Sequence, residues 1–181
     1  MSTQKTVLQQ FGTVEDNELR LETERAEQIV DALNTDIAAL YVLYHQLKKH
    51  HWNVSGAEFR DIHLFLDEAA EDTEDGIDEL AERAGAIGGT PIAGAKATEE
   101  RAPVEPEDED VYDIRTSLEN DLAMHGDIIE SLRDHTELAT NLGDHATAEL
   151  FRGILVDIEE NAHHIEHYLE GDTLVTDGTM R

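Results

Sequence analysis

Four polar residues in one segment have side-chain types and spacing that suit metal binding: His63, Asp67, Asp78 and Glu82. On an α-helix, at about 100° per residue, the four side chains fall within an arc of about 100° and share one face. Yet His63 and Asp78 would lie about 22 Å apart along the axis, at about 1.5 Å per residue. One helix therefore cannot fold both pairs around a single ion.

The two pairs are placed symmetrically along the chain, about a point near residue 72 or 73. If two copies pack antiparallel about a two-fold axis there, His63 and Asp67 of one chain meet Asp78 and Glu82 of its partner. An isologous interface of this kind builds two identical sites. The spacing thus predicts metal chemistry between subunits.

His51 can join this site, because it ends the helical segment before the one that carries His63 and only a tight turn separates the two. Histidine and carboxylate ligands suit iron, manganese or zinc. The predicted site therefore combines His51, His63 and Asp67 of one chain with Asp78 and Glu82 of the other.

Long helices must position these side chains. Apolar residues recur three and four positions apart, which is the helical pattern, and His51 continues the apolar stripe of the first segment. An N-cap at Asp144 separates the last two segments. Helices are predicted at residues 22–51, 57–85, 111–142 and 145–170.

The connection between the second and third predicted helices differs from the others. Residues 86–108 hold all three prolines and an acidic run, which predicts a long connection without a helix. Two helical pairs joined by one long link indicate an all-α, ferritin-like four-helix bundle with a long central crossover connection at residues 22–170. An N-terminal extension, 1–21, and a C-terminal tail, 171–181, flank it.

The composition narrows the function classes. The chain has 181 residues, 42 acidic against 13 basic, a formal charge of −29, and no cysteine. Such a surface repels nucleic acid and anionic membranes and attracts cations. Without cysteine, disulfides, thiolate metal sites and thiol catalysis are excluded.

Most of the acidic charge is interpreted as salt adaptation, and the source is predicted to be a halophile. At ~1 M salt the Debye length is about 3 Å, so like charges repel little. Neither a secretion signal at the start nor a run of about 18 apolar residues is found. A cytoplasmic protein without membrane contact is expected.

A longer pattern surrounds the candidate ligands. It runs His51-Trp52-Asn53-Val54-Ser55-Gly56-Ala57-Glu58-Phe59, then Ile62-His63, Asp67, Asp78, Ala81-Glu82-Arg83-Ala84 and Ile87-Gly88-Gly89-Thr90-Pro91. This pattern resembles the Dps family, the DNA-binding proteins from starved cells, which are mini-ferritins. The resemblance is strongest over residues 40–93, and the helix plan extends it to about residue 170.

The resemblance implies a dodecameric hollow shell with ferroxidase centres at dimer two-folds, where the ligands are divided between two chains as the spacing suggests. It implies oxidation of Fe²⁺, preferably by hydrogen peroxide, and storage of ferric mineral inside. Trp52 matches the family tryptophan beside that centre; packing at a helix end is the alternative for this residue.

Other residues are weaker candidates for iron contact. Glu71 and Glu74 share the face of the quartet and could nucleate mineral, or be solvated surface. By resemblance, an iron-entry pore would involve the start of the last helix. Candidates there are Asp144 and Glu149, with Asp157 deeper; His163, His164 and His167 are candidates for weak iron sites or a subunit contact.

Two alternatives stay open. Glu160 and His163 form an E-x-x-H pair, as in an intrasubunit di-iron centre of a classical ferritin. The other alternative is a DNA-compacting protein, because some Dps proteins bind DNA through lysine-rich tails. Here residues 1–21 hold only Lys5 and Arg20 as cations, and the tail has one arginine, so no DNA binding is predicted.

Overall fold

Five helices account for most of the residues that the computed structural model describes, which are 6–170. They are α1 (Thr23–Asn53), α2 (Phe59–Ala86), α3 (Ala95–Arg101), α4 (Ile114–Asn141) and α5 (His145–Leu169). The four long helices begin and end within three residues of the predicted boundaries. The all-α, ferritin-like architecture predicted from periodicity is confirmed.

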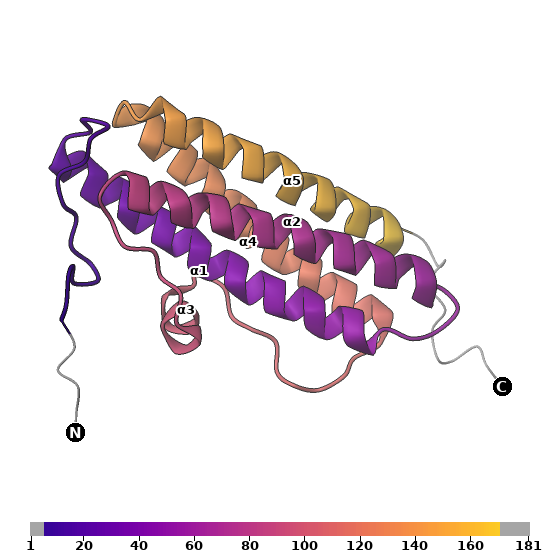
Figure 1. Cartoon of the computed structure of the whole chain (residues 1–181). Coiled ribbons are helices and arrows are strands. Elements are labelled where there is room, and N and C mark those ends of the chain that lie inside the picture. Colours follow the sequence, from indigo (N-terminus) through magenta and orange to yellow (C-terminus); the bar gives the residue numbers. More distant parts are fainter. Residues whose placement is uncertain (1–5, 171–181) are drawn as a thin grey trace, which may run out of the picture.

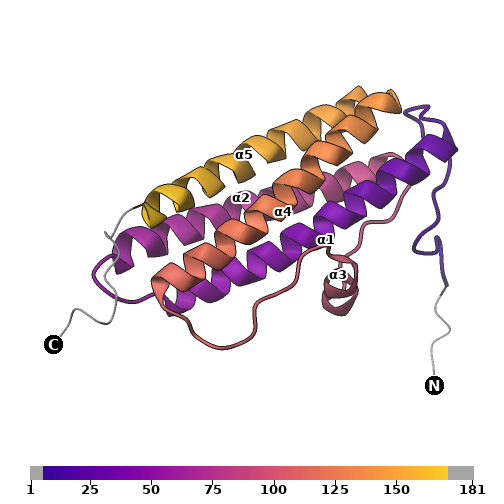
Figure 2. The same ribbon diagram turned by 180° about the vertical axis from the view of Figure 1, so that it is seen from behind.

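The long helices form a four-membered ring of neighbours. Helix α1 runs antiparallel to α2, and α4 runs antiparallel to α5 (Figure 1). Helix α1 also packs on α4, and α2 packs on α5, as the reverse view shows (Figure 2). Since α2 and α4 start at the same end of the bundle, the connection between them returns along its whole length. This is the predicted crossover.

The crossover contains the short helix α3, so the prediction of a connection without a helix was wrong. Its sequence, Ala95–Arg101, is rich in good helix formers despite the prolines on both sides. Arg101 donates to Asp31 Oδ1 of α1 at 2.6 Å and to Thr35 Oγ1 at 3.1 Å. These contacts dock the helix on α1 and supply the tertiary support that a seven-residue helix lacks on its own.

The start of the crossover is tied to the bundle by a buried amide. Asn34 of α1 donates to the carbonyl oxygen of Thr90 at 3.1 Å and accepts from the backbone N–H of Ile92 at 2.7 Å. Gly88, just before, adopts φ +89°, and a Cβ there would collide with the backbone of Glu15. The crossover therefore leaves α2 along one path.

Residues 6–21 of the predicted N-terminal extension form turns rather than a helix, and Glu15 N–H donates to the Gly88 carbonyl at 2.9 Å. Lys5 and the predicted tail, 171–181, lie outside the described residues. Across residues 6–170, none of the helices combines the length and the apolar character that crossing a bilayer requires.

Candidate metal centre

The end of α1 and the start of α2 hold two histidines in a reciprocal arrangement. Nδ1 of His51 donates to the carbonyl oxygen of His63 at 2.9 Å, and Nδ1 of His63 donates to the carbonyl oxygen of His51 at 2.9 Å. The rings stack, with centroids 3.8 Å apart and planes 19° apart. A carbonyl oxygen only accepts, so each ring carries a hydrogen on Nδ1, and in the neutral form of the ring the lone pair that can bind a metal is on Nε2.

Asp67 completes this half-site one helical turn after His63. Its Oδ1 lies 3.8 Å from Nε2 of His51 and accepts from the Lys48 ammonium at 2.6 Å. The hydrogen bond from Lys48, with the charges of Lys48, His51 and His63, holds the pKa of Asp67 below its usual range. Asp67 is therefore an ionised carboxylate beside two ring nitrogens.

Asp78 and Glu82 lie further along α2, on the side of the helix that no other helix within residues 6–170 covers. Both are exposed, and neither pairs with another residue of the described part. Within residues 6–170 of one chain, no three His, Asp or Glu side chains are grouped to hold a metal ion. The structure thus separates the five predicted ligands into two half-sites.

Three large apolar side chains near the histidines are exposed, but two of them lie in separate grooves: Trp52 lines a groove between α1 and the crossover, and Leu64 lines a groove between α2 and α5. Trp52 is 71% exposed, and Phe59 and Leu64 are each 44% exposed. The Phe59 ring stacks on His63, with centroids 5.0 Å apart. Phe59 is therefore the exposed apolar side chain that lies directly against the half-site. In the single chain, Trp52 is not packed at the helix end.

A buried polar network lies behind the half-site and was not predicted. Nδ1 of His50 bonds Asp121 of α4 at 2.8 Å, and its Nε2 bonds Glu107 of the crossover at 2.9 Å. Gln46 donates to Asp121 at 2.9 Å, and Lys49 binds Glu107. Burial lowers the pKa of His50, but the bonds and charges of Asp121 and Glu107 outweigh it and raise the pKa above its ordinary value.

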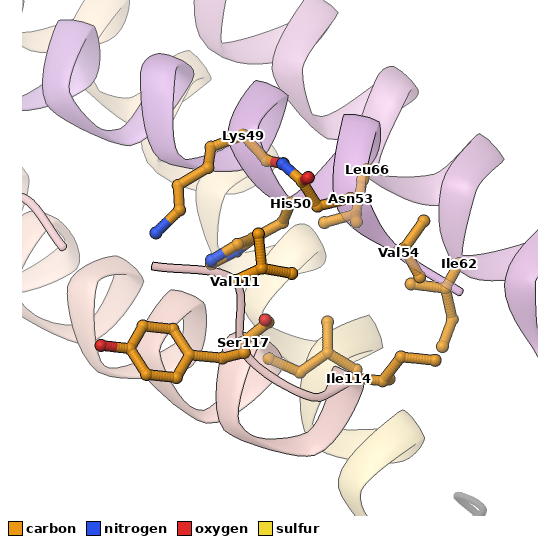
Figure 3. A pocket seen from close by; sticks show the side chains of 11 residues that line it. Lys49, His50, Asn53, Val54, Ile62, Leu66, Val111, Ile114 and Ser117 are labelled. Atoms are coloured by element: carbon orange, nitrogen blue, oxygen red, sulfur yellow. The ribbon is translucent and has the colours of Figure 1, made fainter. Parts of the chain in front are cut away.

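A small, mostly apolar cavity adjoins this network. Figure 3 shows His50 and Lys49 on one side of it and Val111 and Ser117 on the other, where the crossover enters α4. The remaining labelled walls come from the last residue of α1, the turn that follows it, α2 and α4: Asn53, Val54, Ile62, Leu66 and Ile114. The end of α1 is thus held by packing on one flank and by ion pairs on the other.

His51 was predicted to continue the apolar stripe of α1, and this was wrong. His50 is the buried histidine, 4% exposed, whereas His51 is half-buried at the bundle surface. The spacing Leu43, Leu47, His50 follows the same three-and-four rule and could have identified it. The rule alone does not decide between neighbouring residues at a helix end. Lys48 gave no sequence signal, because its partner lies on another helix.

The weaker candidates fall into different surroundings. Glu71 and Glu74 are exposed on the α2 face of Asp78, as predicted from the helix geometry. Asp144 is buried, caps α5 by accepting from Thr147 N–H at 3.1 Å, and pairs with Arg83 at 2.8 Å. Burial raises the pKa of Asp144, but its bonds to Thr147 and Arg83 outweigh burial and hold the pKa below its usual range. These contacts favour a structural role over pore lining.

Glu149 is exposed near the start of α5 and lies 3.4 Å from Arg152, and Asp157 is exposed further along α5. Burial raises the pKa of Asp157, and the charges of Asp72 and Glu160 raise it further.

The predicted E-x-x-H pair does not face the bundle interior, since Glu160 and His163 are both exposed. An intrasubunit di-iron centre in the bundle interior therefore cannot be built on this pair. Near the end of α5, His164 sets its ring edge against Phe65, with centroids 5.9 Å apart. His163 and His167 instead face each other.

Comparisons with known proteins agree with this architecture. A family model of the ferritin-like domain matches residues 30–175. The DNA protection during starvation protein of Halobacterium salinarum is 64% identical over 181 residues, covering 99% of this chain and 100% of that protein. The nutrient stress-induced DNA-binding protein of a Synechococcus species is 40% identical over 168 residues, covering 93% and 96%.

Solved structures agree as well. The crystal structure of an archaeal Dps homologue from Halobacterium salinarum has a TM-score of 0.91 at 64% identity, with 98% of this chain and 99% of that chain covered. The Vibrio cholerae Dps protein, described as a member of a broad superfamily of ferritin-like diiron-carboxylate proteins, has a TM-score of 0.81 at 28% identity. Coverage there is 86% and 97%.

Proposed function

The chain belongs to the Dps family of ferritin-like proteins, and from this membership we propose that it oxidises Fe²⁺ at a centre shared by two subunits and stores the ferric product. The observation that carries the proposal is the reciprocal bonding of His51 and His63. In the neutral rings it places both metal-binding lone pairs on Nε2, near an ionised Asp67, and this donor set suits iron.

A second subunit supplies the remaining ligands. Asp78 and Glu82 are exposed on the uncovered face of α2. At about 1.5 Å per residue, Asp78 lies about 22 Å and Glu82 about 28 Å from His63 along the helix. An antiparallel two-fold contact of α2 with its copy would unite the half-sites. Closed assembly of such dimers into a hollow dodecamer is part of the proposal.

The chemistry assigned to the centre is oxidation of bound Fe²⁺, with hydrogen peroxide as the preferred oxidant. Two Fe²⁺ ions each give one electron, and hydrogen peroxide takes both electrons together with two protons from solvent. Its O–O bond is thereby cleaved to give two water molecules without release of hydroxyl radical. The ligand carboxylates favour the Fe³⁺ product through their charge. Glu71 and Glu74, exposed on the same face, are proposed to nucleate the ferric mineral.

Protection of DNA enters this proposal through iron removal and not through DNA binding. The relatives from Halobacterium and Synechococcus carry DNA in their names. This chain carries a formal charge of −29. Phosphate contacts require lysine and arginine clusters that neutralise the backbone, and the acidic surface opposes them. We assign the chain to iron detoxification in the cytoplasm.

A crystal soaked in Fe²⁺ without oxygen tests the shared centre. Anomalous density at the iron edge is expected between two chains, in contact with His51 and His63 of one and with Asp78 and Glu82 of the partner subunit. Crystals of the Asp78→Ala protein provide the control and should lose this density. Iron bound wholly within one chain would refute the shared centre.

Solution kinetics provide the second test. Asp78→Ala should leave the shell assembled, because the side chain is exposed, and should slow Fe²⁺ oxidation by about 100-fold or more, the upper range for loss of a group that supports a metal site. Glu79→Ala, at the next exposed position of α2, is the matched control and should oxidise iron at the wild-type rate.

A further inference from the structure

His163 and His167 lie one turn apart near the end of α5, and their Nε2 atoms are 3.1 Å from each other. The ring centroids are 4.3 Å apart. Both side chains are more than half exposed, at 60% and 54%. The iron centre proposed above uses neither of them.

The outer nitrogens of the two rings face carboxylates. Nδ1 of His167 lies 3.2 Å from Oε2 of Glu170, and Nδ1 of His163 lies 3.5 Å from Oε2 of Glu166. An ionised carboxylate only accepts, so it favours the hydrogen on Nδ1 in each ring. In the neutral rings two Nε2 lone pairs then face each other, and either a proton on one Nε2 or a metal ion bound to both relieves their repulsion. A histidine whose other nitrogen binds a carboxylate is also the usual form of a metal-ligating histidine.

We propose that His163 and His167 chelate a divalent ion of the borderline transition-metal class, such as Ni²⁺, Cu²⁺ or Zn²⁺, at the surface of α5. Two nitrogens each about 2.1 Å from an ion and 3.1 Å apart subtend an angle of about 95°. That angle suits two adjacent positions of an octahedral or distorted tetrahedral ion, with solvent in the others. Imidazole pairs bind these ions more tightly than they bind Fe²⁺. The site therefore prefers other metal ions than the proposed iron centre does.

The surroundings favour capture of a cation. A shallow groove next to His167 is lined by Asp61 and Glu68 of α2, and these charges attract divalent ions from solution. His164, between the pair in sequence, does not contribute, because its ring packs against Phe65. The chain therefore contains its own matched control, a neighbouring exposed histidine outside the pair.

Calorimetric titration with Ni²⁺ tests the site. The full-length assembled protein is freed of metal by a chelator and kept in molar KCl, with His51→Ala present to weaken the iron centre. A site that binds one Ni²⁺ per chain is expected. Adding His163→Ala or His167→Ala should reduce the affinity of this site at least tenfold, whereas adding His164→Ala should leave it unchanged.

A spectroscopic measurement on the same proteins separates ligation from indirect effects. With one Cu²⁺ per chain, the electron paramagnetic resonance spectrum should show two coordinated nitrogens, and only one after His167→Ala. Equal Ni²⁺ binding by all of these variants, or an equal loss after His164→Ala, would overturn the proposal. Because all of these variants are compared in the same His51→Ala background, any Ni²⁺ bound elsewhere is common to them, and these outcomes do not depend on whether the iron centre is correctly assigned.

Discussion

His51 and His63 exchange hydrogen bonds across the turn between α1 and α2, each Nδ1 donating to the backbone carbonyl oxygen of the other residue at 2.9 Å. Both acceptors belong to helical backbone, so the ring orientations are fixed by the fold before any metal binds. A half-site that is organised in advance loses little conformational freedom on binding. What one chain lacks is the second set of ligands.

Mixed assemblies of two inactive variants should recover activity. A His63→Ala chain and a Glu82→Ala chain each spoil both sites of their own homodimer. In a mixed dimer, one site loses both ligands and the other is intact. Random pairing of equal amounts makes half of the dimers mixed, so about a quarter of the sites should be whole. Co-expressed, purified shells are assayed for Fe²⁺ oxidation.

The matched control combines His63→Ala with His51→Ala. Both substitutions damage the same half-site, so every site in every dimer stays broken and no recovery is expected. If verified mixed shells of the His63→Ala and Glu82→Ala chains stay as inactive as shells of either variant alone, the centre lies within one chain.

Lys48 should weaken metal binding at Asp67. Its ammonium lies 2.6 Å from Asp67 Oδ1, where it occupies an acceptor and repels a divalent cation. Lys48→Met keeps most of the apolar stem and removes the charge, so anaerobic calorimetry should show tighter Fe²⁺ binding, by about tenfold as for other groups behind metal ligands. Lys96→Met, at an exposed pair with Glu100 on α3, is the control. Weaker binding after Lys48→Met would contradict this role.

The sequence predicted the long helices well because apolar spacing and caps are local signals. Helix α2 begins and ends within two residues of its predicted limits, and the Asp144 N-cap is present. Helix α3 was missed since its stability comes from Arg101 bonding Asp31 and Thr35, a contact between segments about 66–70 residues apart. No local pattern records such a contact.

The candidate site shows the same limit. The shared face of His63, Asp67, Asp78 and Glu82 follows from helix geometry, and the structure keeps it. The Lys48–Asp67 pair and the burial of His50 depend on how α1 lies against α2 and α4. Those facts require the tertiary arrangement, and the meeting of the two half-sites requires a second chain.

His135 should make stability depend on pH. Its Nδ1 bonds the fully buried Asp36 of α1 at 2.7 Å. Burial lowers the pKa of His135, but the bond and the charges of Asp36, Asp134 and Asp31 outweigh it and raise the pKa above 6.5. A group whose pKa is raised by folding contributes stability that is fully present below the pKa of the unfolded state. This stability is lost as pH rises through the pKa of the folded state.

The substitution His135→Gln should therefore lower the free energy of unfolding most at acidic pH. Relative to wild type, we expect a loss of about 2 kcal/mol at pH 6, the order of a hydrogen bond between charged groups. The gap between the two melting temperatures should shrink as pH rises to 9. Comparing the variant with wild type at each pH cancels the contributions of His50 and His125. A gap that stays constant from pH 6 to 9 would show that His135 is neutral in the folded protein.

Assembly should weaken at low salt. The uncovered face of α2 carries exposed acids along its length, including Glu71, Glu74, Asp75, Asp78 and Glu82. In an antiparallel two-fold contact the same acids face one another. Lowering KCl from ~1 M to ~10 mM lengthens the Debye distance from about 3 Å to about 30 Å. Light scattering and calorimetry should then show dissociation or a lower melting temperature. Equal stability in both buffers would contradict the interpretation of the charge as salt adaptation.

DNA binding should stay absent under the conditions that favour it most. Low salt strengthens the binding of cationic proteins to DNA, because binding releases the counterions condensed on the phosphates. This chain carries 42 acidic against 13 basic residues, so dilution should strengthen repulsion instead. A gel-shift titration at ~10 mM and ~1 M KCl should show free DNA throughout, with a basic DNA-binding protein as the positive control. A shift that appears at low salt and is reversed by KCl would mean that a local cationic surface outweighs the net charge. DNA compaction would then stand beside iron oxidation as a function of this chain.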